Sequence, residues 1–167
     1  MKISFGVMMA VGLMLSCDPA ITITLEQAVN LPHRSPMSSD RDEHRHPIKT
    51  LTFFGIKPEM TVVEIWPGSK GWYTEILAPF LYKKGRLVTA NFDGSTGIEY
   101  FANAAKKFTR KLTQNPEIYD RVQNVVLMPP KKVNPVPLKT VDMVLTFRNM
   151  HNWINNKIDS EMFSVIH

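Results

Sequence analysis

The sequence predicts a doubly wound α/β fold built on a parallel sheet with the strand order 3-2-1-4. Short apolar runs alternate along the chain with longer segments in which apolar residues recur at helical spacing. The first apolar run, residues 61–66, is almost continuous, as is typical of a central parallel strand that is covered on both faces. Such folds have right-handed crossovers, and in their usual strand order, 3-2-1-4, the first and fourth strands lie side by side.

Composition predicts one globular domain that is stabilised by its core. The chain has 167 residues, of which 44% are hydrophobic and 21% are charged. Because it contains a single cysteine, it can form neither an internal disulfide nor a CxxC metal site. The net charge of +5 suits an anionic ligand or a membrane surface and does not imply nucleic-acid binding.

The first 17 residues resemble an export signal. Lys2 precedes an apolar stretch, residues 3–15, that is too short to span a bilayer. The Met14-Leu15-Ser16-Cys17 sequence is similar to a bacterial lipoprotein cleavage box, which predicts a lipid anchor on Cys17. Cleavage by the ordinary signal peptidase near Ala20 and an uncleaved membrane anchor are the alternatives. Each of them predicts an exported chain that is periplasmic or attached to the membrane.

Residues 18–58 are expected to form an N-terminal extension with cover helices, and residues 59–167 to form the sheet domain. Residues 18–36 show no periodic pattern and are expected to be irregular. Asp40 and Glu43 have the spacing of a capping box, which predicts a helix that starts in this polar tract.

The elements that follow alternate in type. A short helix begins at Pro47 and ends near Gly55. After the strand at 61–66, the predicted elements are, in chain order, a helix that contains Trp72 and ends by Gly85, a strand at 86–91, a helix at 96–114, a strand at 122–128, a proline-rich loop at 129–137, a strand at 141–147 and a helix that begins near Asn155. The helix at 96–114 carries a basic face, which solvation explains more simply than nucleic-acid binding.

In doubly wound sheets, ligands bind at the carboxyl ends of the strands, beside the point where the strand order reverses. The first strand carries an acidic residue, Glu64, and is followed by the turn Pro67-Gly68-Ser69-Lys70-Gly71. Glycines let a ligand approach the backbone closely, and the start of the next helix offers free N–H groups. The spacing matches neither the GxGxxG dinucleotide motif nor a P-loop. An ordinary turn is the alternative interpretation.

Asp93 follows the second strand, where doubly wound folds place the carboxylate that accepts two ribose hydroxyls. The alternative is that Asp93 only caps the next helix. The fourth strand is followed by Arg148, Asn149, His151 and Trp153. Histidine is the residue type that accepts a proton near neutral pH, and arginine suits a carboxylate or phosphate. Structural roles, such as a capped turn or a core side chain, are the alternatives for these residues.

A metal site formed by His33, His44 and His46 with Asp42 is a further alternative. His44 and His46 are two residues apart, so their side chains diverge on a helix. The sequence therefore predicts no metal.

Four segments together resemble a family of bacterial class I S-adenosylmethionine-dependent methyltransferases, many of which carry export signals. The segments are residues 62–68, the helix start at 71–77, the Asn91-Phe92-Asp93 strand end and residues 145–153. The resemblance covers residues 30–167. It implies a seven-stranded Rossmann-like fold that binds S-adenosylmethionine and transfers its methyl group to an acceptor that the sequence does not identify.

The resemblance also implies roles for individual residues. Those implied to bind the cofactor are Glu64, Pro67, Gly68, Ser69 and Gly71 for the methionine part, Asp93 for the ribose, Pro129 for the adenine and Phe147 as a closing wall. Those implied to act on the acceptor are Arg148, Asn149 and His151, with His151 as the base.

The chain departs from the family pattern in two ways. Trp66 stands where such methyltransferases usually carry a glycine. Full-length relatives continue into three further strands, so we expect a truncated form, weakly active or inactive, that lacks the last strands. The strand at 141–147 would then be an exposed apolar edge that favours self-association. An exported or lipid-anchored binding protein that uses the same pocket is the alternative function.

Overall fold

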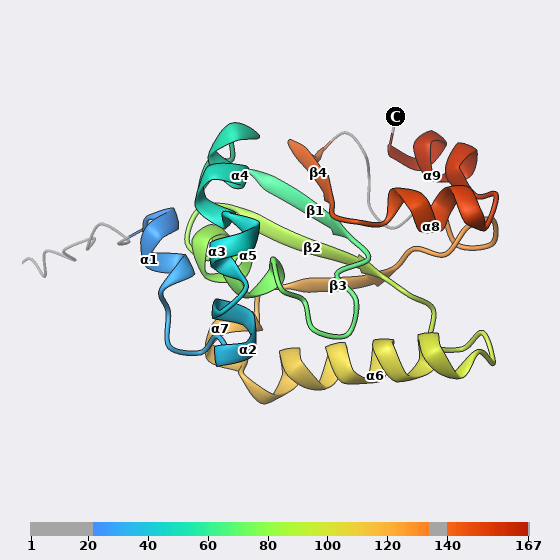
Figure 1. Ribbon diagram of the computed structural model, residues 1–167, viewed down its shortest axis with the longest axis horizontal. Coiled ribbons are helices and arrows are strands. Elements are labelled where there is room, and N and C mark those ends of the chain that lie inside the picture. Colours follow the sequence, from blue (N-terminus) through green and yellow to red (C-terminus); the bar gives the residue numbers. More distant parts are fainter. Residues whose placement is uncertain (1–21, 134–139, 167) are drawn as a thin grey trace, which may run out of the picture.

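Four parallel strands form a sheet in the order β3-β2-β1-β4 (Figure 1). The computed structural model describes residues 22–133 and 140–166. Its strands are β1 (Thr61–Ile65), β2 (Arg86–Asn91), β3 (Gln123–Val126) and β4 (Met143–Thr146). The strand order and the parallel pairing confirm the predicted doubly wound α/β fold.

Two predictions lie partly or wholly outside the described residues. They are the export signal at residues 1–17, with Cys17, and the part of the proline-rich loop at 134–139. Among the helices that are described, none combines the length and the apolar character that a membrane crossing requires.

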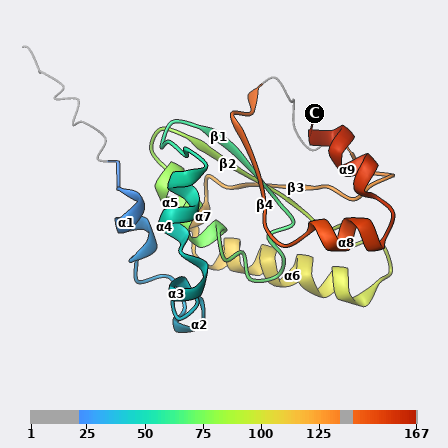
Figure 2. The ribbon, with the colours of Figure 1, turned by 45° about the horizontal axis from the view of Figure 1, so that its top comes forward.

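The described helices fall into a group that precedes the sheet and a group that follows β1. The first group is α1 (Leu25–Val29), α2 (Pro36–Ser39), α3 (Asp42–Arg45) and α4 (Pro47–Phe53). The second group is α5 (Thr74–Leu81), α6 (Glu99–Gln114), α7 (Pro116–Tyr119), α8 (Met150–Asn155) and α9 (Asp159–Ile166). Figures 1 and 2 both show the first group on one side of the molecule and the α8–α9 pair on the other.

Strand residues alternate between two apolar clusters. Val62 of β1 and Leu87 of β2 pack with α1, α4 and α5, whereas Val63 and Val88 pack with α6, α8 and α9. The alternation follows because successive side chains of a strand point to opposite faces of the sheet. Trp153 of α8, in the second cluster, is the largest of the fully buried side chains among the described residues.

Two expectations for the N-terminal segment are wrong. Residues 18–36 are not irregular throughout, because α1 forms there on a capping box: the Gln27 N–H donates to Thr24 Oγ1 (3.2 Å) and the Thr24 N–H donates to Gln27 Oε1 (2.7 Å). A helix does start in the polar tract, because α3 begins at Asp42, but the predicted capping box does not form: α3 has no side-chain cap, and Asp40 instead ends α2, which is capped by the Ser35 hydroxyl. A helix of five residues is too short for apolar periodicity to reveal it.

The C-terminal helices also differ from the prediction. Instead of one helix that begins near Asn155, α8 begins at Met150 and α9 at Asp159. Between them Lys157 has the left-handed conformation (φ 57°), and the Ile158 N–H donates to a carbonyl of α8. Such helix ends usually carry glycine, and the absence of one here hid the boundary.

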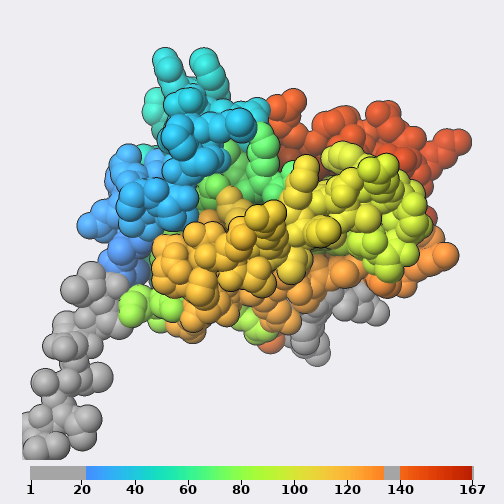
Figure 3. Space-filling model, turned by 90° about the horizontal axis from the view of Figure 1, so that it is seen from below, coloured from blue at the N-terminus to red at the C-terminus, as the bar shows by residue number. Residues whose placement is uncertain are grey.

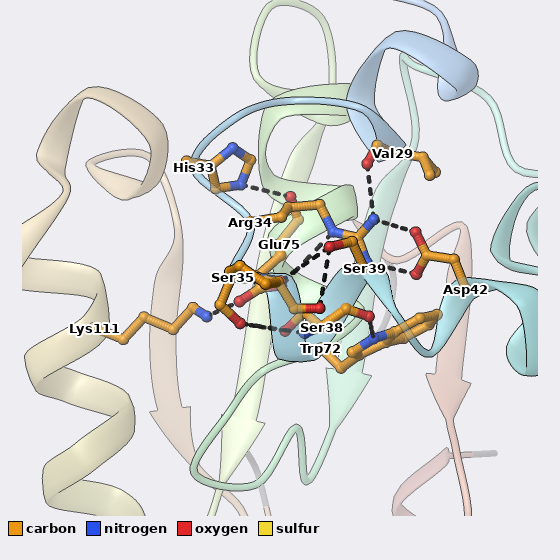
Figure 4. Close-up of polar contacts among 11 residues, drawn as sticks. Val29, His33, Arg34, Ser35, Ser38, Ser39, Asp42, Trp72, Glu75 and Lys111 are labelled. Atoms are coloured by element: carbon orange, nitrogen blue, oxygen red, sulfur yellow. Dashed lines mark hydrogen bonds and ion pairs between the residues drawn. The ribbon is translucent and has the colours of Figure 1, made fainter.

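A buried arginine, Arg34, connects the N-terminal segment with α5 (Figure 4). Arg34, 6% exposed, donates through Nη1 to the Val29 carbonyl (2.7 Å) and through both terminal nitrogens to the Asp42 carboxylate (2.6 and 2.8 Å). Its Nε lies 3.7 Å from Oε2 of the buried Glu75 in α5. Lys111 of α6 is ion-paired with the other oxygen of Glu75. One guanidinium thus connects α1 and α3 with α5 and, through Glu75, with α6.

We predict that Arg34→Ala lowers the free energy of unfolding by about 3 kcal/mol, because two carboxylates lose the cation that they share in a buried site. Urea denaturation followed by tryptophan fluorescence measures the change. Arg110→Ala, on the exposed face of α6, is the matched control and is expected to shift the midpoint little. Equal midpoints for the two variants would contradict the role assigned to Arg34.

Candidate functional site

A cavity of about 380 Å³ opens at the carboxyl ends of β1 and β4, which are neighbours in the sheet. Its volume lies in the range of small-molecule sites. Its walls come from α2 and α3, the end of β1 with the turn that follows, the start of α6 and the end of β4. Figure 3 shows the N-terminal segment (blue) and α6 (yellow) on either side of green residues that follow β1. The cavity lies where ligands of doubly wound sheets bind.

Six of the predicted site residues line this cavity. They are Glu64, Pro67, Gly68, Ser69, Phe147 and Arg148. The other five, Gly71, Asp93, Pro129, Asn149 and His151, are not part of its lining.

The two glycines of the turn serve different purposes. Gly68 has a positive φ of 71°, and a Cβ built on it would meet no atom within 4 Å. The backbone at Gly68 is therefore open to the cavity and can be approached closely. Gly71 also has a positive φ (57°), but a Cβ there would lie 2.6 Å from the Phe108 ring. Gly71 is required for packing between the turn and α6 rather than for contact with a ligand.

Glu64 is a buried carboxyl group at the cavity floor. Its side chain leaves β1 on the side of α5, where the Thr74 hydroxyl donates to Glu64 Oε2 (2.6 Å), and the residue is 3% exposed. Burial raises the pKa of Glu64 to about 7, although the Thr74 hydrogen bond opposes the shift. Near neutral pH, Glu64 can therefore exchange between a neutral acid and a carboxylate.

Left-handed residues end both strands at the cavity. Trp66 follows β1 with φ 50°, and Arg148 lies beyond β4 with φ 62°. The Trp66 indole points toward β3, donates to the Leu127 carbonyl (2.9 Å) and packs against Phe92 and Trp153 (ring centroids 5.1 and 6.1 Å away). This φ favours glycine, the residue type that the resemblance leads us to expect at the Trp66 position.

Asn149 connects the ends of β1 and β4. Its Nδ2 donates to the Ile65 carbonyl (3.0 Å) and to the Thr146 hydroxyl (3.0 Å), and the residue is buried. These contacts support the alternative interpretation of Asn149, in which it has a structural role. His151 follows on the exposed surface of α8.

Asp93 lies beyond β2 and is engaged by its neighbours. Its Oδ2 pairs with Lys132 Nζ (2.7 Å), and its Oδ1 accepts from the Ser95 N–H (3.0 Å) and hydroxyl (2.7 Å). The Lys132 hydrogen bond, followed by those of Ser95, lowers the pKa of Asp93 to about 2. The Ser95 bonds form a local turn, whereas Lys132 comes from the loop after β3. The alternative interpretation of Asp93 as a helix cap is wrong, because α6 begins after Ile98. Pro129, buried in the loop after β3, is likewise outside the cavity lining.

Sequence reasoning missed the part of the cavity wall that comes from α2, α3 and the start of α5. Arg41 and Arg45 line it from the N-terminal segment, and Tyr73 stacks on Phe147 with the ring centroids 3.6 Å apart. The spacing of four residues between the two arginines was a usable signal, because it places both on one side of a helical turn. Which side faces a cavity is not encoded by that spacing.

The alternative metal site does not form among the described residues. No group of three or more His, Cys, Asp or Glu side chains is placed to hold a metal ion there. His33 Nε2 instead donates to the Glu75 carbonyl (2.9 Å), while Asp42 is held by Arg34.

We predict that Glu64→Gln removes a pH-dependent part of the stability. The folded pKa of Glu64 lies above its ordinary value, so the protonated carboxyl stabilises the fold; this contribution is complete below about pH 4.5 and is lost as the pH rises through about 7. From about pH 4.5 to about pH 7.5, the unfolding free energy of the wild type should fall by about 3 kcal/mol relative to that of Glu64→Gln. Urea titrations at both pH values test this, with the exposed Glu59→Gln as the control. Parallel pH profiles for wild type and Glu64→Gln would refute it.

Comparisons with known proteins support the fold. No protein-family model matches the chain, and no curated protein does. Among solved structures, the chain is similar to a SAM-dependent methyltransferase from Aquifex aeolicus, with a TM-score of 0.53 and 22% sequence identity. The match covers 87% of this chain and 68% of that chain. The α/β architecture with the sheet order 3-2-1-4 is thus that of a Rossmann-like methyltransferase fold.

Proposed function

We propose that this chain binds S-adenosylmethionine in the cavity at the ends of β1 and β4 and transfers its methyl group to an acceptor. The position of the cavity carries the proposal. It lies where the order of a 3-2-1-4 sheet reverses, between an open glycine turn and a buried carboxyl group. The similarity of the fold to that of a solved SAM-dependent methyltransferase supports the proposal.

The cavity residues fit the charged end of this cofactor. Gly68 leaves room for close approach, and Glu64 can compensate a positively charged amino group once it is ionised. When bound, the cofactor supplies an electrophilic methyl group on a sulfonium. The chain would mainly bind and orient the two reactants, with Phe147 and Arg148 on the side of the acceptor.

Asp93 remains our proposed ligand for the ribose. The Lys132 side chain that pairs with it is 48% exposed, and ion pairs with exposed lysines are weak. Two ribose hydroxyls can therefore compete for the carboxylate, which stays charged because its pKa is about 2. His151 is the proposed base for an acceptor that extends past Arg148 to α8.

An exported or lipid-anchored binding protein that uses the same cavity without catalysis is the second candidate. It is favoured by the positions of Asp93 and His151, neither of which lines the cavity. Mass spectrometry of the small molecules released from the purified, denatured chain separates the two proposals. S-adenosylmethionine or S-adenosylhomocysteine among them supports the methyltransferase, and a different bound molecule supports the binding protein.

We predict that the chain binds S-adenosylhomocysteine with an affinity that depends on the ionisation of Glu64. Binding the ligand's ammonium group requires the carboxylate, so a proton must leave whenever the pH is below the pKa of about 7. The affinity measured by calorimetry should fall about tenfold for each pH unit below 7 and level off above it. Glu64→Gln should bind at least tenfold more weakly at about pH 7.5 and show no such slope.

Two further variants complete this test. Asp93→Ala is expected to weaken S-adenosylhomocysteine binding at least tenfold, whereas the exposed Glu59→Gln should leave it unchanged. Folded wild-type chain that does not bind S-adenosylhomocysteine at millimolar concentration would rule out the proposed function.

A further inference from the structure

We propose that the cavity recognises an oxyanion, a carboxylate or a phosphate, on a second ligand through Arg45 and Arg148, and that this ligand is the methyl acceptor. The assignment of the ligand as an acceptor rests on the proposed function. The oxyanion site itself is argued from the charges of the cavity wall.

Four cationic side chains converge on the cavity. Arg41 and Arg45 reach it from the α2–α3 segment, Lys70 from the turn after β1, and Arg148 from the end of β4. Among residues 22–133 and 140–166, the ion pairs join Arg34 with Asp42 and Glu75, Lys111 with Glu75, and Lys132 with Asp93. None of them involves the four cations of the cavity.

The cavity wall contains little negative charge to balance these cations. Glu64 is the acidic residue of the lining, and its raised pKa keeps it partly neutral near pH 7. Lys70 Nζ contacts the uncharged Met37 sulfur (2.9 Å). Uncompensated cations in a concave site focus a positive potential, which attracts an anion.

Arg45 shows the effect of this crowding. Burial lowers the pKa of Arg45, and the positive charges of Arg41 and Arg148 lower it further. Arg45 nevertheless keeps a defined position, because its guanidinium lies 4.7 Å from the centre of the Trp72 ring. A planar guanidinium that is already oriented loses little freedom when it binds a planar oxyanion through two hydrogen bonds.

The surroundings of the cations suggest what carries the oxyanion. Tyr73 and Phe147 stack with 15° between their ring planes, and Trp72 completes an aromatic wall beside Arg45. Burial raises the pKa of Tyr73, so its phenol stays neutral. The site therefore suits a small anion with an aromatic or apolar body.

Benzoate and inorganic phosphate are the probes, with uncharged benzamide for comparison. Calorimetry with the full chain should show benzoate or phosphate binding that weakens at least tenfold in Arg45→Gln and in Arg148→Gln. Arg45→Lys, which keeps the charge, should recover part of the affinity. Arg110→Gln, exposed on α6 and outside the cavity, should match the wild type within twofold. Benzamide should not bind.

The relative affinities for benzoate and phosphate show which anionic group the ligand carries. Tighter binding of benzoate indicates a carboxylate on an aromatic body, and tighter binding of phosphate indicates a phosphate ester; either result supports an oxyanion site. The proposal is overturned if neither probe binds, if benzamide binds as well as benzoate, or if Arg110→Gln loses as much affinity as the cavity variants. Arg148 is exposed, so Arg148→Gln keeps the test valid even if Arg45→Gln fails to fold.

Titration of S-adenosylhomocysteine with and without saturating benzoate separates this inference from the proposed function. We expect its affinity to change less than twofold with benzoate and in Arg148→Gln. If benzoate displaces it, the cations hold the cofactor's own carboxylate, so the acceptor assignment is wrong while the proposed function stands. If benzoate binds and S-adenosylhomocysteine does not, the proposed function fails, the acceptor assignment fails with it, and only the oxyanion site survives.

Discussion

The shape of the cavity depends on the contacts of one buried side chain, the Arg34 guanidinium. An arginine is costly to remove from water, so it stays buried only where carbonyl and carboxylate oxygens satisfy its donors. Asp42 of α3 and the Val29 carbonyl accept the hydrogen bonds of Arg34, and the Glu75 carboxylate of α5 lies 3.7 Å from its Nε as an ion-pair partner. Arg34 thus holds α3 against the helix that covers β1. Arg41 and Arg45, which lie beside Asp42, form a cavity wall because α3 is held there.

The second determinant is the backbone at the ends of β1 and β4. A left-handed conformation costs a residue other than glycine roughly 1–2 kcal/mol. At Trp66 this cost is offset by the burial of the indole and its hydrogen bond to the Leu127 carbonyl. Asn149 binds the Ile65 carbonyl and so holds the two strand ends together. The backbone on both sides of the cavity, at Gly68 and at Arg148, is therefore held in place by contacts between neighbouring strand ends.

The position of a residue was easier to predict when it depends on neighbours in the sequence than when it depends on residues far away in the chain. Glu64 and Gly68 line one cavity at the predicted edge of the sheet, because an acid within an apolar strand and a glycine turn after it are local signals. Their contact with a cofactor stays a prediction. Gly71 has the same local signal, but its role depends on the Phe108 ring in α6. Asp93 lies at the predicted strand end, yet the Lys132 ammonium, from the loop after β3, takes one of its oxygens.

Local patterns in the sequence were enough to predict the alternation of strands and helices and the central position of β1, because hydrophobic periodicity is a property of short segments. The strand order 3-2-1-4 followed as the usual one for this alternation. This order also located the edge of the sheet where the cavity lies. Which side chains face that cavity, among them Arg41, Arg45 and Tyr73, depends on how the elements pack together. The orientation of a short helix such as α3 depends on partners far away in the chain, here Glu75 through Arg34, and no local pattern of residues specifies such a partner.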